Sequence, residues 1–137
     1  MDIQNKQKEY KKTYDMTYSC QYHVIFCPKY RRNVLIDGVD KRLKEIILDL
    51  QVKCDFDIIE MEVMSNHVHL LLNVNPKIGI HNVISKIKGQ SSSILRKEFP
   101  FLKSKLPCLW TRSKFISTVG SVSLEVVKKY IEEQKNV

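Results

Sequence analysis

The 137-residue sequence has no apolar run long enough to cross a membrane, and its first residues are polar where a secretory signal would be apolar. It also has no internal repeat and no low-complexity tract. The cysteines are few and scattered, and no two have the spacing of a zinc ribbon or a redox motif. These absences predict a cytoplasmic protein with reduced and mostly buried thiols, namely Cys20, Cys27, Cys54 and Cys108.

What the sequence does contain is typical of one folded domain with a basic surface. Its length suits a single domain over residues 1–137, and its 43% hydrophobic content is too high for a disordered chain. Residues 1–17 are polar and lysine-rich, so we expect a flexible basic arm there, irregular or in part helical. The net charge of +8 and the isoelectric point near 9.3 suit a polyanion such as nucleic acid, although a merely solvated basic surface would look the same.

Hydrophobic spacing predicts an α+β fold. Apolar side chains that recur every two residues indicate strands, and those that recur every three or four indicate helices. The predicted strands cover residues 19–26, 57–63, 67–74 and 114–119, and the predicted helices cover 40–54, 80–99 and a last segment that includes Tyr130. The order β-α-β-β-α-β is that of a ferredoxin-like or RRM-like antiparallel sheet with helices on one face, here followed by a C-terminal helix that holds the tyrosine.

Local signals predict how several of these elements begin and end. Asp40 and Ser123 are expected to cap the first and last helices, because their side chains can accept hydrogen bonds from free backbone N–H groups. Gly89 lies within the second helix, where it costs roughly 1 kcal/mol relative to alanine, so we expect another backbone to approach it closely. Residues 100–113, which contain two prolines, are predicted to form a loop.

His67 and His69 are the first candidate functional residues. On a strand they project from one face, while Val68 between them points into the core. Two imidazoles can hold a divalent metal and leave its other positions open for phosphate oxygens and one more side chain. Taken alone, such a pair is more often two polar residues on the exposed face of a half-buried strand.

Tyr130 and Gln134 form the second candidate pair. Four residues apart on a helix, they share one face about a turn apart. The amide oxygen of Gln134 could be a third metal ligand, and the phenol of Tyr130 could be a nucleophile. Taken singly, Gln134 would be interpreted as an ordinary exposed helix residue and Tyr130 as a tyrosine anchored in the core. Together with the histidine pair, the basic charge and a sheet with one open face, they favour an enzyme that cuts nucleic acid through a phosphotyrosine.

Other residues have weaker claims. The rival metal ligands, which an ordinary charged surface explains as well, are Glu60, Glu62, Glu132 and Glu133. Two further histidines have no partner at a useful spacing and are interpreted as structural, namely His23 and His81. The candidate nucleic-acid contacts, among which an aromatic ring could stack on a base, are Lys29, Tyr30, Arg31, Arg32, Lys86 and Lys97. A solvated loop would explain the cluster around Tyr30 equally well.

Four segments of the sequence resemble the single-tyrosine HUH transposases, small enzymes that mobilise insertion sequences as single-stranded DNA. The HUH motif, two histidines around a hydrophobic residue, is matched by His67-Val68-His69. The matching segments follow one another in the family's order and extend over nearly the whole chain, at residues 22–31, 64–70, 88–92 and 130–134. A lone His-x-His is a weak signal, whereas the four segments together are specific.

The resemblance implies a mechanism. Tyr130 would attack a DNA phosphate and become linked to the 5′ end, and His67, His69 and Gln134 would hold Mg²⁺ or Mn²⁺ at the scissile phosphate. Similar enzymes recognise hairpins near the ends of the element and act as homodimers, in which each tyrosine helix serves the histidines of the other subunit. Only three residues follow Gln134 in this sequence, so we expect few contacts to anchor the tyrosine helix.

Two other interpretations remain open. The same chemistry could belong to a hairpin-associated nickase or to a replication or plasmid-transfer nickase, although a short chain without accessory domains favours transposition. The element order also occurs in non-catalytic RNA-binding modules, which stack bases on aromatic residues of the central strands. The histidines of strand 67–74 stand where such a module would have aromatics.

Overall fold

The computed structural model describes residues 10–119 and 124–137. Its main sheet consists of β3 (Gln21–Phe26), β4 (Phe56–Met64), β5 (His67–Val74) and β6 (Phe115–Thr118), and a smaller sheet pairs β1 (Lys11–Lys12) with β2 (Thr17–Tyr18). The α-helices of this part of the chain are α2 (Val39–Lys53), α3 (Ile80–Glu98), α4 (Phe101–Lys105) and α5 (Leu124–Glu133). Two short 3₁₀ turns complete the order, η1 (Lys29–Arg31) and η2 (Gln134–Asn136). None of these described helices is both long enough and apolar enough to span a bilayer.

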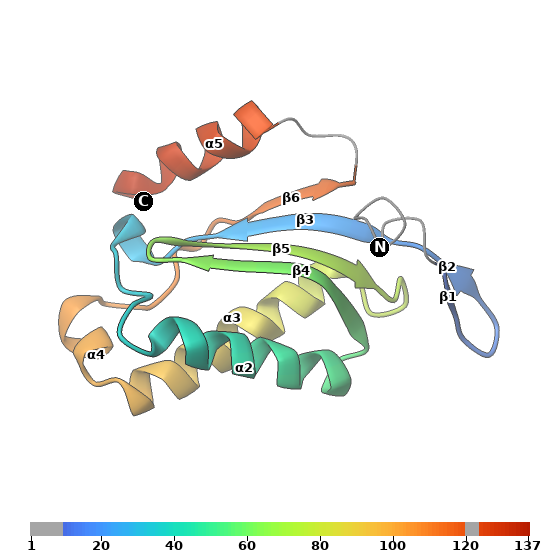
Figure 1. Cartoon of the computed structure of the whole chain (residues 1–137), viewed down its shortest axis with the longest axis horizontal. Coiled ribbons are helices and arrows are strands. Elements are labelled where there is room, and N and C mark those ends of the chain that lie inside the picture. The colour runs from blue at the N-terminus through green and yellow to red at the C-terminus, as the bar shows by residue number, and fades with distance from the viewer. Residues whose placement is uncertain (1–9, 120–123) are drawn as a thin grey trace.

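The main sheet is antiparallel, and helices lie on both of its faces. The strand order is β4-β5-β3-β6, so β5 and β3 are the central strands. Figure 1 shows α2 and α3 beneath one face and α5 above the other, over β6 and β3. The predicted α+β, ferredoxin-like fold is confirmed, and the tyrosine helix lies on the face that α2 and α3 leave uncovered.

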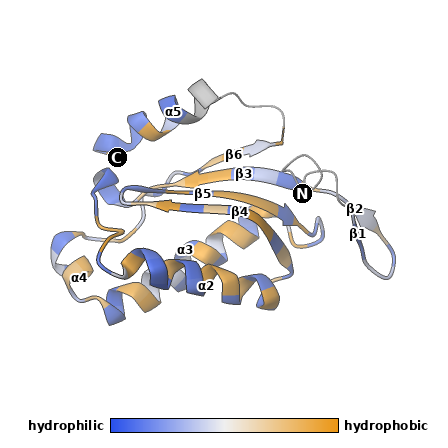
Figure 2. Cartoon of the chain, in the orientation of Figure 1, coloured by the Kyte–Doolittle hydropathy of each residue, from blue (hydrophilic) through white to orange (hydrophobic). Residues whose placement is uncertain are grey.

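The hydrophobic core lies between the sheet and the helices α2 and α3. Alternate residues of β5, among them Val68, Leu70 and Leu72, are fully buried in this core, as the two-residue period of a strand requires. Both helices contribute apolar side chains at intervals of three and four, and Figure 2 shows apolar and hydrophilic residues alternating along them. Each such large side chain stabilises the fold by roughly 1.5–3 kcal/mol relative to leaving it exposed.

Several helix features differ from the prediction. α2 begins after Gly38, whose φ of +97° favours glycine, so Asp40 lies inside the first turn and does not cap the helix. Its carboxylate in that position still interacts favourably with the helix dipole. A Cβ placed on Gly89 would meet nothing within 4 Å among the described residues, so the expected close approach of another backbone is wrong. The predicted cap Ser123 lies outside the described residues.

Two segments expected to lack regular structure contain some. Of the predicted arm, residues 1–9 lie outside the description, whereas β1 and β2 form a short hairpin in which Lys11 pairs with Tyr18. The predicted loop 100–113 contains the short helix α4. Elements of two to five residues are too short for an apolar period to show in the sequence.

All four cysteines are free thiols, as predicted, but their burial varies. Cys27 is completely buried, Cys20 and Cys54 are partly exposed, and Cys108 is exposed, so the expectation of mostly buried thiols is wrong. Burial raises the pKa of Cys27 to about 11, which keeps this thiol protonated and unreactive at neutral pH.

Candidate active site

His67 and His69 lie on the sheet face opposite the main core. Both belong to β5, and their neighbours Val68 and Leu70 belong to the core beneath the sheet. Both histidines are partly exposed, and Glu62 of β4 lies directly opposite His69. The alternation predicted from the sequence therefore places the two imidazoles together where a ligand can reach them.

His67 is held in the form that a metal ligand needs. Its Nδ1 donates to Asn66 Oδ1 over 2.9 Å, which leaves the lone pair of Nε2 for another partner. Burial lowers the pKa of His67 below its ordinary value, and the positive charges of His69 and Arg31 lower it further. Glu62 has the opposite, smaller effect. At neutral pH the ring is therefore uncharged, with Nε2 able to bind a cation.

His69 has a neighbour that the sequence does not reveal. Nδ1 of His23, on β3, lies 3.2 Å from Nε2 of His69, and the two ring centroids are 5.4 Å apart. The register pairs His69 with Ile25, so His23 is a diagonal neighbour on the same face. The expectation that His23 has no partner is therefore wrong, whereas His81 is exposed on α3.

Tyr130 and Gln134 meet on one serine. The hydroxyl of Tyr130 donates to Ser113 Oγ over 3.4 Å, and the hydroxyl of Ser113 donates to Gln134 Oε1 over 2.7 Å. The Tyr130 ring packs at 46° against Phe115 of β6, with ring centroids 5.2 Å apart. The tyrosine and the glutamine thus share one face, as predicted, and Gln134 is buried.

The phenol of Tyr130 is not activated in this arrangement. Burial raises its pKa above the ordinary value of 10.0, and the hydrogen bond with Ser113 offsets only part of that rise. A neutral phenol is a weak nucleophile. Attack on a phosphate therefore requires a nearby positive charge that favours the ionised form.

The row of residues across the sheet relates the tyrosine to the histidines. His69 pairs with Ile25, and Ile25 pairs on its other side with Phe115, the residue on which Tyr130 packs. Neighbouring strands lie about 4.8 Å apart, so the backbones at His69 and Phe115 are separated by roughly 10 Å. Tyr130 therefore packs on the same face as the histidines, against a residue two strands away from His69.

The tyrosine–glutamine pair and the histidine pair remain distinct on this face. In the part of the chain that is described, hydrogen bonds link Tyr130 with Gln134 through Ser113, and none links either of them to the histidine pair. No three His, Cys, Asp or Glu side chains of the described residues converge as a group that could hold a metal. The metal roles of the histidines, of Gln134 and of the rival Glu60 and Glu62 therefore stay predictions.

The C-terminal end of the tyrosine helix is anchored by η1. The backbone N–H of Tyr30 donates to the carbonyl of Val137 over 2.9 Å. The guanidinium of Arg31 donates to the carbonyl of Ile131 over 3.3 Å and to the carboxylate of Glu132 over 3.2 Å. Both η1 residues have positive φ, 59° and 50°, which is uncommon for side chains other than glycine. The expectation of few anchoring contacts is therefore wrong.

The loop that precedes β6 and contains Ser113 is held by α3. Nζ of Lys88 donates to the carbonyl of Thr111 over 2.7 Å and lies 3.4 Å from the carbonyls of Arg112 and Ser113. Burial and then the charge of Lys114 lower the pKa of Lys88 to about 8. Lys88 thus supports the residue that holds the tyrosine.

Sequence reasoning missed Ser113 and Lys88 as parts of this arrangement. Both are common residue types, and neither has a special spacing from the tyrosine or the histidines. The one signal in the sequence is that residues 88–92 resemble a segment of the transposase family. In the structure, Lys88 of this segment donates to the loop before β6. In that segment the buried Ser91 also accepts a hydrogen bond from the indole of Trp110 over 3.0 Å.

The candidate nucleic-acid contacts are divided between two surfaces. Lys29, Tyr30 and Arg32 lie at η1 beside the end of α5, and Nζ of Lys29 is 5.2 Å from the centre of the exposed Tyr30 ring. Lys86 and Lys97 are exposed on α3, in the helical layer on the other side of the sheet from the histidines (Figure 1). Their roles as DNA contacts stay predictions.

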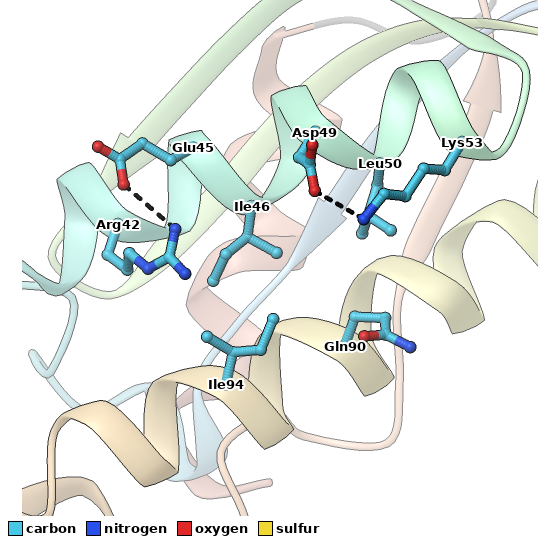
Figure 3. Close-up of a pocket in the computed structure, with 8 residues that line it drawn as sticks. All are labelled: Arg42, Glu45, Ile46, Asp49, Leu50, Lys53, Gln90 and Ile94. Carbon is cyan, nitrogen blue, oxygen red and sulfur yellow. Dashed lines mark hydrogen bonds and ion pairs between the residues drawn. The ribbon is translucent and has the colours of Figure 1, made fainter.

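A hollow between α2 and α3 lies away from the candidate site. Figure 3 shows that its charged side chains pair with each other, Arg42 with Glu45 and Lys53 with Asp49. The hollow is in the helical layer, on the opposite side of the sheet from the histidines (Figure 1). We therefore do not assign it to the candidate active site.

Comparison with known sequences identifies relatives over most of the chain. Residues 16–134 match the family described as IS200-like transposases. The ISDra2 transposase TnpA of Deinococcus radiodurans is 39% identical over 92% of this chain and 91% of its own length. The transposase for insertion sequence IS200 of Salmonella typhimurium is 31% identical over 86% of this chain and 81% of its own length.

Two solved structures have a similar fold. A crystal structure described as that of a transposase from Deinococcus radiodurans has a TM-score of 0.83 and 34% identity, covering 93% of this chain and 99% of that one. A REP-associated tyrosine transposase bound to a REP hairpin has a TM-score of 0.56 and 14% identity, covering 91% of this chain and 68% of that one. At that identity the second likeness concerns the fold alone.

The family match and the named relatives support a DNA-processing enzyme of the transposase class. The chain belongs to the IS200-like transposase family. The predicted family is thereby confirmed, and the names of the relatives support the predicted transposase function, whereas the roles of individual residues stay predictions.

Proposed function

We propose that this transposase cleaves and rejoins single-stranded DNA at the ends of its insertion sequence. Tyr130 is the nucleophile and forms a covalent 5′-phosphotyrosine, and His67, His69 and Gln134 hold a divalent metal. The observation that best supports the proposal is the row across the sheet, in which Tyr130 packs on the same face as the partly exposed His69.

The cleavage step exchanges one phosphate ester for another. The phenolic oxygen of Tyr130 forms a bond to the scissile phosphorus, and the bond from that phosphorus to the 3′ oxygen breaks. The phenol loses its proton, and the departing 3′ oxygen takes up a proton to become a free hydroxyl. Because an ester bond is kept throughout, a 3′ hydroxyl can later attack the phosphotyrosine, rejoin the DNA and release Tyr130 without ATP.

The residues fit a divalent metal by their chemistry. His67 is neutral and keeps its Nε2 lone pair available. The oxygen of Gln134 would have to exchange the hydroxyl of Ser113 for the metal. When bound, the metal would polarise the scissile phosphate and favour the ionised phenol. Mn²⁺ suits two imidazoles better than Mg²⁺, which prefers oxygen ligands.

We further propose that the enzyme recognises hairpins near the ends of the element and acts as a homodimer. The hairpin proposal is supported by the shared fold of the REP-associated tyrosine transposase, which binds a REP hairpin. The net charge of +8 favours a polyanionic partner. The dimer is supported by the hydrogen bond that Tyr130 donates to Ser113, because in this arrangement the phenol contacts Ser113 and not the histidines. A second subunit could then provide the tyrosine that completes the site.

The alternative functions have less support. An RNA-binding module of this element order would stack bases on aromatic residues of the central strands. On the histidine face, the side chains of the central strands β3 and β5 are instead those of His23, Ile25, His67, His69 and Leu71, of which Ile25 and Leu71 are buried. The names of the relatives favour transposition over a replication or plasmid-transfer nickase.

A labelled single-stranded DNA taken from the flanks of the gene tests the proposal. With Mn²⁺, a denaturing gel should show a covalent protein–DNA complex, and the size of the released fragment gives the cleavage position. Tyr130→Phe should abolish the complex and retain DNA binding, because only the nucleophilic oxygen is removed. Tyr14→Phe is the matched control, since Tyr14 is fully exposed at the β1–β2 hairpin. Wild-type amounts of complex in Tyr130→Phe would overturn the assignment.

A further inference from the structure

His23 contributes a second-strand contact to the histidine motif. Its Nδ1 lies 3.2 Å from Nε2 of His69, with the two rings tilted by 33°. The contact joins β3 to β5, the two central strands, whose hydrogen-bonded register fixes both backbones. His69 therefore cannot rotate freely without losing this contact.

The position of the protons decides whether His69 can bind a metal. A hydrogen bond between two imidazole nitrogens needs one N–H donor and one lone pair. If His23 donated, the only lone pair of a neutral His69 would be occupied. If His69 Nε2 donates instead, its Nδ1 keeps a lone pair that a metal can use.

We propose that His23 is a positioning residue of the metal site, which accepts the Nε2–H of His69 and thereby leaves Nδ1 of His69 for a divalent metal. This inference rests on the proposed function, because it assumes that His69 is a metal ligand. It adds a residue to the site and specifies which nitrogen of His69 binds. In HUH terms the motif would contain two opposite tautomers, since His67 donates from Nδ1 to Asn66.

His23 is partly buried on the same face as His69, and its Nδ1 faces Nε2 of His69 over 3.2 Å. A role as a third metal ligand is less favoured, because no three His, Cys, Asp or Glu side chains of the described chain converge as ligands.

The tautomers can be measured without any metal. Nitrogen-15 NMR of the imidazole rings at pH of about 8, above the ordinary histidine pKa of about 6.5, reports which nitrogen holds the proton. His69 should be protonated at Nε2 and His67 at Nδ1, whereas the exposed His81 serves as the reference ring. Protonation of His69 at Nδ1 in the wild-type protein would overturn the proposal.

Variants of His23 then separate an orienting hydrogen bond from simple packing. His23→Phe fills the same space without an acceptor, whereas His23→Asn keeps an acceptor oxygen near the position of Nδ1. His23→Phe should give a mixture of His69 tautomers and roughly 10-fold weaker Mn²⁺ binding by calorimetry, and His23→Asn should restore most of both. His81→Phe is the control substitution, and circular dichroism checks that each variant is folded.

Each outcome bears on one of the two proposals. Wild-type tautomers and Mn²⁺ affinity in folded His23→Phe would overturn the positioning role. Three imidazole nitrogens on Mn²⁺ in pulsed electron paramagnetic resonance would also overturn it, because His23 would then be a ligand. If His67→Ala binds Mn²⁺ as tightly as the wild type, the proposed metal site itself fails, whatever the tautomer of His69.

Discussion

The hydroxyl of Tyr130 donates a hydrogen bond to Ser113 Oγ over 3.4 Å. The same serine donates to Gln134 Oε1 over 2.7 Å, so one side chain holds both proposed functional residues of the tyrosine helix. Tyr130 would have to give up its hydrogen bond to Ser113 to attack DNA, and Gln134 would have to give up its own to bind a metal. The arrangement is therefore a resting one, stabilised by two hydrogen bonds that the reaction gives up.

Removing this hydroxyl should make the tyrosine easier to release. We expect Ser113→Ala to form the covalent DNA complex roughly three- to tenfold faster, because a typical hydrogen bond contributes about 0.5–1.5 kcal/mol. Single-turnover assays on denaturing gels measure this rate. Ser85→Ala, at an exposed position on α3, is the control. A slower reaction in Ser113→Ala would mean that the serine holds Tyr130 in its working position.

The histidines should dominate metal affinity. We expect His67→Ala and His69→Ala each to weaken Mn²⁺ binding by at least about 10-fold, since each removes an imidazole ligand. Gln134→Ala should have a smaller effect, because a neutral amide oxygen that already accepts from Ser113 is the weaker ligand. Calorimetry with DNA present measures all three, with His81→Ala as the control. Unchanged affinity in both histidine variants would refute the metal role.

Lys88 should give the stability of the protein a specific pH dependence. Its pKa is about 8 in the folded protein against 10.5 ordinarily, so between these values the unfolded chain binds more protons. The free energy of unfolding therefore rises as the pH increases from about 8 to 10.5. Below pH 8 the buried lysine is charged in the folded state, and the cost of burying that charge is fully present.

The test is a comparison of variants in urea unfolding between pH 7 and pH 10.5. Lys88→Met should lose the Lys88 contribution to the rise, so its difference from the wild type changes steadily with pH. Lys86→Met, which replaces an exposed lysine two residues earlier on the same helix, should keep the wild-type slope. Parallel curves for Lys88→Met and the wild type would contradict the low pKa.

The proposed sharing of sites between subunits can be tested by mixing two inactive proteins. If the tyrosine and the histidines of one site come from different subunits, a mixed dimer of Tyr130→Phe and His67→Ala has one intact site, and cleavage returns. If each site forms within one chain, both sites of the mixed dimer are defective. Exchange of subunits must first be shown with differently labelled proteins, and inactivity after exchange would exclude sharing.

Local periodicity explains why much of this protein is predictable from its sequence. Alternation along residues 67–74 is enough to place His67 and His69 on one face and Val68 on the other, because the two-residue period belongs to any strand. The four-residue separation of Tyr130 and Gln134 puts them on one face of a helix for the same kind of reason. The element order then favours the ferredoxin-like sheet. Each of these inferences depends on residues that are near one another along the chain.

Contacts between residues that are far apart in the sequence were decided only by the tertiary structure. His23 meets His69 because β3 and β5 pair in one register, and a different register would separate them. Ser113 meets Tyr130, and Arg31 meets Ile131, because α5 packs back across the sheet. No local period encodes such pairs, since they follow from how the strands align and the helices pack. The sequence by itself therefore determined which residues share a face, and packing determined which of them touch.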